Sequence, residues 1–385
     1  MVDYSVTKIS NQRLNSYEYQ NEKIFLESYP KILFVELTQN CNLACKMCRT
    51  STSYQKQLNM RNETFKNIQT QLFQYASVVD LRGFGESTIL DDFENKLYET
   101  HKYGVKTRLV TNAISIKPNI WKALFETNTT IIISVDAITD TLIKKLGRGS
   151  YYKLEKSLNQ ALKLKQNNEG GEIFINTIVS SLNLEEISEI VSFAKKYPIS
   201  RITLFPVVAT PDNPFHLSHR EADVSVFLEQ AIKKAKENNI ELRLGASLHE
   251  EYAVNKGLIQ RCSHPWEYCY IDYQGNIGYC DHLIGHSALT IGNINEKPFK
   301  DIWNCNELQN IRKMHSNRQG LNRNLLQEKL PHCNWCYNRR YIDFEDDITP
   351  ELKPVVVSTA SLDPQGIERL NNRSNDFLRA RDLPY

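Results

Sequence analysis

The 385-residue sequence lacks a long uninterrupted hydrophobic run. A membrane-spanning helix needs about 20 predominantly apolar residues, and the mean hydropathy of −0.47 is typical of a chain without one. The first residues also lack a basic stretch followed by an apolar one, which a secretory signal would have. We therefore expect a cytoplasmic protein with no membrane partner.

An excess of charge of one sign is missing as well. The 47 basic residues are balanced by 45 acidic ones, which leaves a formal net charge of +2. Proteins that bind nucleic acid usually carry a strongly basic domain or stripe. The charge balance therefore gives no indication of a nucleic-acid partner.

Cysteine is absent from residues 49–261 and again from residues 337–385. Clustered thiols in a reducing cytosol are more typical of metal binding or catalysis than of disulfides. The two clusters predict two separate metal-binding regions. The nine cysteines are Cys41, Cys45 and Cys48 near the N-terminus, and Cys262, Cys269, Cys280, Cys305, Cys333 and Cys336 in the last third.

Between the two cysteine groups, short apolar runs alternate with charged segments of helical spacing. Strands alternating with helices form a parallel sheet in an α/β fold. Six such units fit a partial (β/α)6 barrel better than a closed eightfold one. Strands are expected at 32–37, 78–81, 108–111, 131–135, 173–179 and 201–205, with a further one at 240–244, and helices at 92–101, 151–166, 184–196 and 221–238.

Composition divides the chain into four parts. After residue 245 the strand–helix rhythm stops, and Gly, His, Tyr, Trp and Cys become frequent. A hairpin is expected over residues 270–279, with its turn at 274–276. The expected parts are an N-terminal extension (1–30), the partial barrel (31–245), a small cysteine-rich domain (246–340) and a polar tail (341–385).

The first three cysteines directly follow the first expected strand. They therefore lie on a loop at the carboxyl end of a parallel sheet, where βα barrels bind their ligands. Three thiolates on one loop suit Zn²⁺ or an iron–sulfur cluster. A structural zinc site normally has a fourth protein ligand, and the nearest histidine in the sequence is His101. Three protein ligands leave one metal position open for a small molecule.

Three residues separate Cys41 from Cys45, and two, the second of them Met47, separate Cys45 from Cys48. This spacing after a first strand resembles the signature of the radical S-adenosylmethionine (radical SAM) enzymes. The resemblance implies that the three cysteines hold a [4Fe–4S] cluster whose fourth iron is chelated by S-adenosylmethionine. It further implies reductive cleavage of this cofactor to a 5′-deoxyadenosyl radical, which abstracts a hydrogen atom from the substrate. A reducing partner such as flavodoxin or ferredoxin would supply the electron.

Glycines and polar residues follow the next expected strands at the same end of the sheet. Residues 83–86 resemble the family's Gly-Gly-Glu segment, although Phe84 separates the two glycines. Glycine lets a backbone approach a ligand closely, and Glu86 is expected to accept a hydrogen bond from the cofactor's ammonium group. Arg148 is expected to pair with the cofactor's carboxylate. The residues that the resemblance places at S-adenosylmethionine are Gly83, Gly85, Glu86, Asn112, Ser134, Asp136 and Arg148.

A second interpretation of these positions is that each begins a loop or caps a helix. On this interpretation Arg148 is an arginine on an exposed loop and does not contact the cofactor. This interpretation leaves the three cysteines unexplained.

The second cysteine group resembles the SPASM/twitch region of the same family. The resemblance rests on the Cys-x-x-Pro-Trp opening at Cys262, the spacing from Gly275 to Cys280, the segment 291–304 and the final Cys-x-x-Cys pair, and it covers about residues 31–340 with the first group. No cysteine follows the pair, so the resemblance implies a single auxiliary [4Fe–4S] cluster, with zinc as the alternative. Its expected ligands are Cys262, Cys280, Cys333 and Cys336.

Two cysteines remain outside these sets. Cys305 is expected to pack in the core. Cys269 lies on the first strand of the hairpin and is expected to be a buried, inert thiol. A substitute cluster ligand, or a donor that returns a hydrogen atom to a substrate radical, are the alternatives for Cys269.

An auxiliary cluster near the substrate favours a two-electron oxidation, as in the aminocyclitol dehydrogenases of this family. Epimerisation is the nearest competitor, because it needs a hydrogen donor such as Cys269. We expect a small polar substrate, such as a sugar or an aminocyclitol, with a ribosomally made peptide as the alternative. A non-catalytic iron–sulfur or zinc protein is a further possibility, against which the open three-cysteine site argues.

Overall fold

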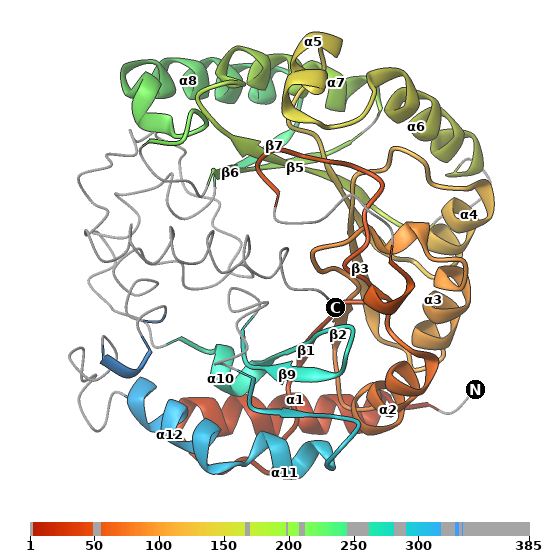
Figure 1. The fold of residues 1–385 in the computed structure, drawn as a ribbon, viewed down its shortest axis with the longest axis vertical. Helices are drawn as coiled ribbons and strands as arrows, with labels where there is room; N and C mark the ends of the chain where they lie inside the picture. The colour runs from red at the N-terminus through yellow and green to blue at the C-terminus, as the bar shows by residue number, and fades with distance from the viewer. Residues whose placement is uncertain are drawn as a thin grey trace.

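The computed structural model describes residues 3–48, 55–165, 170–197, 199–207, 212–244, 262–280, 290–316, 328–330 and 333. Its centre is one curved sheet with the strand order β10-β9-β8-β1-β2-β3-β4-β5-β6-β7 (Figure 1). Neighbours from β1 to β7 pair in parallel. β8 joins β1 in parallel, whereas β9 and β10 add antiparallel strands at that edge.

All seven runs expected as strands in the barrel are strands, and their bounds shift by at most two residues. The parallel order confirms the partial barrel. The strands are β1 (Ile32–Val35), β2 (Val78–Asp80), β3 (Lys106–Thr111), β4 (Thr130–Ser134), β5 (Ile173–Val179), β6 (Arg201–Pro206), β7 (Glu241–Leu244), β8 (Tyr268–Ile271), β9 (Asn276–Gly278) and β10 (Gly292–Asn293).

Helices α2 to α8 follow the outside of the curved sheet (Figure 1). The helices are α1 (Ser5–Gln20), α2 (Asn62–Leu72), α3 (Phe93–His101), α4 (Pro118–Glu126), α5 (Asp140–Leu146), α6 (Tyr151–Lys165), α7 (Ile187–Lys196), α8 (Glu221–Glu237), α10 (His264–Glu267), α11 (Phe299–Trp303) and α12 (Asn306–His315). The described residues also contain four short 3₁₀ turns, η1 (Lys56–Leu58), η2 (Ser87–Ile89), η3 (Leu184–Glu186) and η4 (Leu217–Arg220). Among the described residues no helix combines the length and the apolar character that crossing a membrane requires.

The sheet has an outer face covered by helices and a concave inner face. Leu33 and Val35 belong to the main core, which also contains the buried side chains of the outer helices. Ile32 and Phe34 form a separate cluster with Tyr268 and Tyr270. Successive side chains on a strand point to opposite faces. The second cluster, which we call the inner-face cluster, therefore lies on the concave side.

The polar N-terminal segment contains a helix with a polar buried face. Asn11, Asn15 and Glu18 are the buried residues of α1. Asn11 donates from Nδ2 to the carbonyl of Tyr29 at 3.1 Å, and Asn15 donates to the carbonyl of Trp266 at 2.8 Å. α1 therefore connects the start of the barrel with the C-terminal region through hydrogen bonds, without an apolar stripe.

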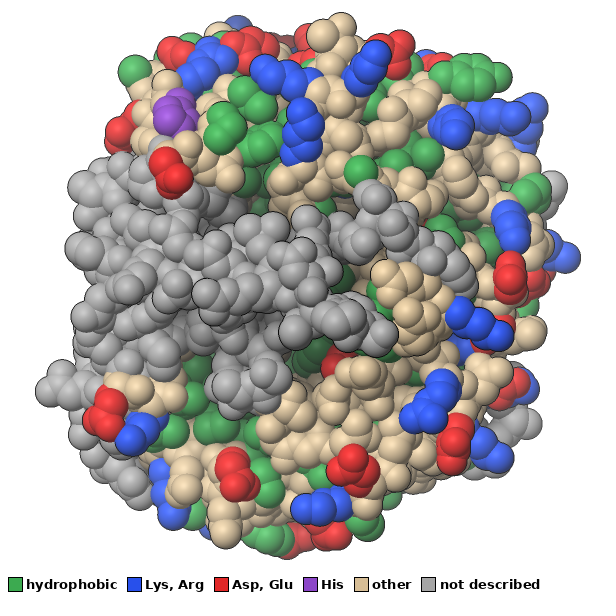
Figure 2. Space-filling view, viewed as in Figure 1, with side chains coloured by type: hydrophobic (Ala, Val, Ile, Leu, Met, Phe, Trp, Pro, Cys, Tyr) green, Lys and Arg blue, Asp and Glu red, His purple; other side chains and the backbone are tan. Residues whose placement is uncertain are grey.

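The expected hairpin is present as β8 and β9, with Gly275 at the turn in a left-handed conformation of φ +89°. Because β8 pairs with β1, the hairpin extends the barrel sheet. The boundary predicted near residue 245 and the tail predicted for 341–385 lie outside the described residues, so the division into parts stays a prediction. On the face in Figure 2, basic and acidic side chains are interspersed along the helical rim.

Candidate functional site

The first three cysteines lie on the loop that leaves β1, at the carboxyl end of the sheet. Cys41 and Cys45 are partly buried and Cys48 is exposed. The amide of Cys48 donates to the carbonyl of Cys45 at 2.9 Å, which turns this part of the loop tightly. The loop is held by residues at the ends of β2, β3 and β4.

Asn112, directly after β3, holds the loop from one side. Its side-chain Nδ2 donates to Oδ1 of Asn42 at 2.8 Å and lies 3.9 Å from Sγ of Cys41. Its backbone amide donates to Oε2 of Glu86 at 2.7 Å. Asn112 is therefore fixed at its backbone while its side chain orients the cysteine loop.

Glu86 is buried, and its carboxylate bridges the ends of β2 and β3. Oε1 accepts hydrogen bonds from the hydroxyls of Thr111 at 2.7 Å and Thr88 at 2.6 Å, and Oε2 accepts from the amide of Asn112. The sequence predicted an acceptor for the cofactor's ammonium group. That contact stays a prediction; the structure adds a role that sequence reasoning missed, in which the carboxylate of Glu86 positions Thr111 and Asn112.

Gly83 and Gly85 are needed because their segment packs directly on the start of the cysteine loop. A Cβ on Gly83 would lie 2.3 Å from Cγ of Glu36, and one on Gly85 would lie 2.4 Å from the carbonyl oxygen of Thr38. The amide of Gly85 also donates to that carbonyl at 3.2 Å. The predicted close approach to a ligand stays a prediction, and the structure shows in addition a close approach to the protein's own loop.

Glu36 ends the first apolar run and is fully buried. Its Oε1 accepts from the amide of Phe84 at 2.8 Å, and its Oε2 accepts from Nε2 of Gln39 at 3.1 Å. Burial raises the pKa of Glu36 to about 7, and the nearby charge of Asp272 adds to this. In the sequence, a carboxyl group at the end of an apolar strand is the signal that could have identified Glu36 as a buried residue of the site.

Arg148 holds the cysteine loop from the other side. Its Nη1 donates to Sγ of Cys45 at 3.3 Å, its Nη2 donates to the carbonyl of Ser134 at 2.6 Å, and its Nε pairs with Oδ2 of Asp136 at 2.9 Å. Burial opposes the charge on Arg148, but Asp136 and Cys45 hold the pKa of the guanidinium above its usual value. Arg148 in turn offsets part of the rise that burial causes in the pKa of Cys45. Ser134 and Asp136, at the end of β4, are thus linked through Arg148 to the predicted metal ligand Cys45.

The cysteine loop also packs on the end of α5. The amide of Lys46 donates to the carbonyl of Leu146 at 3.0 Å. Gly147 ends α5 at φ +73°, and a Cβ there would lie 2.3 Å from the carbonyl oxygen of Ala44. Glycine at position 147 therefore allows both the left-handed helix end and the contact with the loop.

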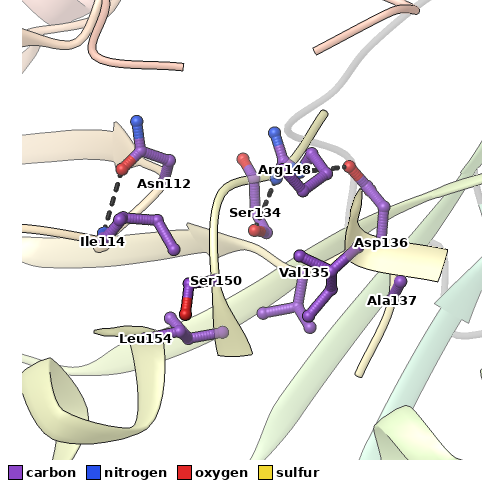
Figure 3. A pocket seen from close by; sticks show the side chains of 10 residues that line it. Asn112, Ile114, Ser134, Val135, Asp136, Ala137, Arg148, Ser150 and Leu154 are labelled. Carbon is purple, nitrogen blue, oxygen red and sulfur yellow. Dashed lines mark hydrogen bonds and ion pairs between the residues drawn. The ribbon is translucent and has the colours of Figure 1, made fainter. Parts of the chain in front are cut away.

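Four of the seven residues expected at the cofactor line one pocket of about 270 Å³, a volume that includes space open to solvent. Figure 3 shows Ser134, Asp136 and Arg148 on one side of it and Asn112 on the other. Gly83, Gly85 and Glu86 are not among the residues that line it. The lining consists of Asn112, Ile114, Ser134, Val135, Asp136, Ala137, Ile143, Arg148, Ser150 and Leu154.

The three thiols of the loop are suitable ligands for the positively charged iron atoms of an iron–sulfur cluster. Burial raises the pKa of Cys41 to about 12, and the charges of Glu86, Cys48 and Cys45 add to the rise. Metal binding removes the proton from such thiols, and one side of the site carries the cation of Arg148. Among the described residues, no three His, Cys, Asp or Glu side chains gather in the arrangement of a single-ion site.

Three of the four expected auxiliary ligands lie close enough to one buried tyrosine to influence its ionisation. The hydroxyl of Tyr279 lies 3.4 Å from Sγ of Cys333. Burial raises the pKa of Tyr279 well above its usual value, and the charges of Cys333, Cys280 and Cys262 contribute. Of these three thiols Cys333 contacts the tyrosine directly, while Cys336 lies outside the described residues.

Cys269 and Cys305 both pack against apolar side chains. Cys269 is fully buried in the main core, whereas its neighbours Tyr268 and Tyr270 belong to the inner-face cluster. Its thiol therefore points toward the outer helices, and burial raises its pKa. Cys305 precedes α12 and packs against the same core. These placements agree with two inert thiols and turn Cys269 away from the inner face, where a hydrogen donor would have to be.

Comparison with family models matches two parts of the chain. Residues 35–194 match the radical SAM superfamily, and residues 262–337 match SPASM, an iron–sulfur cluster-binding domain. The first match includes the cysteine loop, Glu86, Asn112 and Arg148. The second includes all four cysteines predicted as auxiliary ligands.

Individual relatives are distant. The AdoMet-dependent heme synthase of Methanosarcina barkeri is 26% identical over 300 residues, which are 73% of this chain and 84% of that protein. The mycofactocin maturase MftC of Mycobacterium tuberculosis is 24% identical over 72% of this chain and 71% of its own. The crystal structure of Streptococcus suis SuiB bound to its precursor peptide SuiA has a TM-score of 0.63 at 19% identity, covering 79% of this chain and 71% of SuiB. That similarity shows a shared fold.

Proposed function

The chain belongs to the radical SAM superfamily and carries a C-terminal SPASM iron–sulfur domain, and from this we propose that it cleaves S-adenosylmethionine reductively and abstracts a hydrogen atom from a substrate. One observation carries the proposal. The loop with the three thiols contacts Arg148 and Asn112, and both of these residues line the same pocket. A cofactor in this pocket would lie directly beside the metal ligands.

We assign the metal ligands as the sequence predicted. Cys41, Cys45 and Cys48 would hold a [4Fe–4S] cluster next to S-adenosylmethionine, and the four C-terminal cysteines would hold one auxiliary [4Fe–4S] cluster. When bound, the first cluster and S-adenosylmethionine supply the one-electron cleavage and the hydrogen abstraction. The four C-terminal ligands are Cys262, Cys280, Cys333 and Cys336.

The residues of the chain orient these groups. Arg148 places a cation against the thiolate of Cys45, and Asp136 fixes the direction of its guanidinium. Asn112 orients the other half of the loop and is itself fixed by the buried carboxylate of Glu86. The apolar members of the pocket lining would pack against a bound cofactor, and exclusion of water by a filled pocket would protect a reactive radical from side reactions.

For the substrate, we propose a small polar molecule such as a sugar or an aminocyclitol that undergoes a two-electron oxidation. The substrate would lose one hydrogen atom to the 5′-deoxyadenosyl radical, then one electron to the auxiliary cluster and one proton to solvent. Epimerisation requires that a hydrogen atom be returned to the substrate. The outward orientation of Cys269 supports oxidation, because this thiol cannot return a hydrogen atom on the inner face.

A ribosomally made peptide is the second candidate substrate. The structure of SuiB bound to a precursor peptide supports it, because SuiB shares this fold.

Mass spectrometry of the product distinguishes oxidation from epimerisation. Oxidation removes two hydrogens from the substrate, whereas epimerisation leaves the mass unchanged.

The central test uses protein reconstituted with iron and sulfide under anaerobic conditions, then supplied with dithionite and S-adenosylmethionine. We expect 5′-deoxyadenosine as a product and about eight irons per chain, as two [4Fe–4S] clusters require. Absence of 5′-deoxyadenosine with fully loaded protein would contradict the proposed function. An iron content near four would remove the auxiliary cluster from it.

A further inference from the structure

Two buried side chains outside the cofactor pocket contact the C-terminal thiols. Nδ1 of His264, the first residue of α10, lies 3.1 Å from Sγ of Cys280. The hydroxyl of Tyr279 lies 3.4 Å from Sγ of Cys333. The exposed fractions are 4% for His264 and 1% for Tyr279, so water does not replace these contacts.

Metal binding fixes the direction of both hydrogen bonds. A cysteine that binds iron does so as a thiolate, which has no proton to donate. The sulfurs of Cys280 and Cys333 would therefore accept, while Nδ1–H of His264 and the hydroxyl of Tyr279 donate. Each of two different ligand sulfurs would receive one hydrogen bond from a buried side chain.

The surrounding packing holds α10 and its donor in place. The ring of His264 packs on Tyr268 with centroids 4.1 Å apart. Arg312, which is fully buried, donates from Nε to the carbonyl of Pro265 at 2.9 Å and from Nη2 to the carbonyl of Trp303 at 2.9 Å. α10 is thus anchored to α11 and α12, and the imidazole has little freedom to leave its sulfur.

We propose that His264 and Tyr279 raise the reduction potential of the auxiliary centre. Reduction increases the negative charge on the ligand sulfurs, so a donor binds the reduced state more strongly than the oxidised one. This inference rests on the proposed role of the C-terminal cysteines as ligands of that centre.

The raised potential has a use in the proposed reaction. A substrate radical that gives up one electron and one proton becomes the oxidised product, and the auxiliary centre is reduced by that electron. Hydrogen bonds that favour the reduced centre make this transfer more favourable. The C-terminal donors would thus direct the reaction toward oxidation.

The test is a redox titration of the full chain, followed by electron paramagnetic resonance. A Cys45→Ala background, expected to lack the first cluster, leaves the auxiliary centre as the sole signal. Tyr279→Phe removes only the hydroxyl, and His264→Phe keeps a ring against Tyr268 but removes the donor. Tyr197→Phe is the matched control, because Tyr197 is an equally buried tyrosine whose hydroxyl contacts Glu155 on the outer helices.

We expect a lower midpoint potential in each of the two donor variants, a larger fall in the double variant, and the unaltered potential in Tyr197→Phe. A tenfold lower ratio of reduced to oxidised centre at fixed potential corresponds to about 59 mV for a one-electron couple. Unchanged potentials in both donor variants, an equal shift in the control, or loss of the auxiliary iron from both would overturn the inference. Failure of the proposed function is visible separately, as absence of 5′-deoxyadenosine from the wild-type chain.

Discussion

The two groups of cysteines differ in what their sulfurs contact. In the N-terminal loop Cys48 is exposed, and Cys45 accepts a hydrogen bond from the ion-paired Arg148. In the C-terminal group Cys280 and Cys333 contact the buried side chains of His264 and Tyr279. A site with an ion pair beside a pocket suits a centre that binds and releases a ligand. A site with buried hydrogen-bond donors suits a centre that stores an electron.

The two groups also belong to one sheet. The first follows β1, and the second brackets β8 and β9, which extend the sheet from β1. Glu36 lies between them, since it contacts Gln39 of the first loop and its pKa is influenced by Asp272 of the hairpin. The comparison therefore predicts that each centre can be removed without loss of the other. It also predicts that the stability of the sheet between them depends on pH through Glu36.

The largest effect is expected from Cys45→Ala. Removal of one ligand from a three-ligand site should abolish formation of 5′-deoxyadenosine and leave about four of about eight irons, those of the auxiliary centre. Iron analysis and chromatography of the cleavage products measure both. Retained cleavage activity would show that this loop is not the site of the reaction.

Cys262→Ala should give the complementary result. The chain should lose the auxiliary iron but continue to form 5′-deoxyadenosine, because the first site does not use this thiol. Substrate oxidation should fall below detection, since the electron from the substrate radical then has no acceptor. Loss of cofactor cleavage together with substrate oxidation would contradict the independence of the two centres.

Arg148→Gln is expected to reduce the rate of cofactor cleavage by about 10–100-fold, as removal of a partner of a metal ligand often does. The variant loses the cation at Cys45 and a polar wall of the pocket. Arg148→Lys keeps the charge without the three-way contact and should recover part of the rate.

Arg201→Gln is the matched control for Arg148→Gln. Arg201 pairs with Glu241 at 2.7 Å at the amino end of β6, the end opposite the cysteine loop. We expect its cleavage rate to stay at the wild-type value. If both variants lost the same fraction of the cleavage rate, the effect of Arg148→Gln would be a general loss of stability and not a change at the site.

The fold was accessible from the sequence because its strands are short apolar runs between amphipathic helices. α1 was missed for the opposite reason. Its buried residues are Asn11, Asn15 and Glu18, so the pattern that marks a helix by apolar spacing is absent. The continuation of the sheet from β1 into β8 depends on a pairing across more than 230 residues of chain, which no local pattern encodes.

The site was accessible where chemistry alone selects the residue type. Cysteine spacing predicted both groups of thiols. Asn112, Ser134 and Asp136 line one pocket, as their positions after successive strands suggested, and Arg148 from the segment after α5 lines it too. The partners of Glu86 and the packing of Gly83 and Gly85 were not accessible. They depend on how closely neighbouring strand ends approach one another, which is set by tertiary packing.

Glu36→Gln should change how the stability of the metal-free chain depends on pH. The pKa of Glu36 is about 7 in the folded chain and 4.5 as its ordinary value. The folded state therefore binds the extra proton between these values, and the free energy of unfolding falls as pH rises through this window, by about 3 kcal/mol. Glutamine imitates the protonated carboxyl and should remove this fall. Urea denaturation at pH 5, 6, 7 and 8 measures the free energy of unfolding of both proteins. The same dependence of this free energy on pH in the two proteins would contradict the prediction.

The smallest effect is expected from Cys269→Ala. The thiol is buried in the main core and points away from the inner face, so its loss removes one buried sulfur atom from the packing. We expect a cost in the free energy of unfolding of about 1 kcal/mol, with substrate turnover and the iron content unaltered. Continued cofactor cleavage without product would instead identify Cys269 as the hydrogen donor of an epimerase. That outcome would replace oxidation as the proposed reaction. It would also require β8 to expose the thiol of Cys269 on the inner face during catalysis, because in this structure Cys269 faces the outer helices.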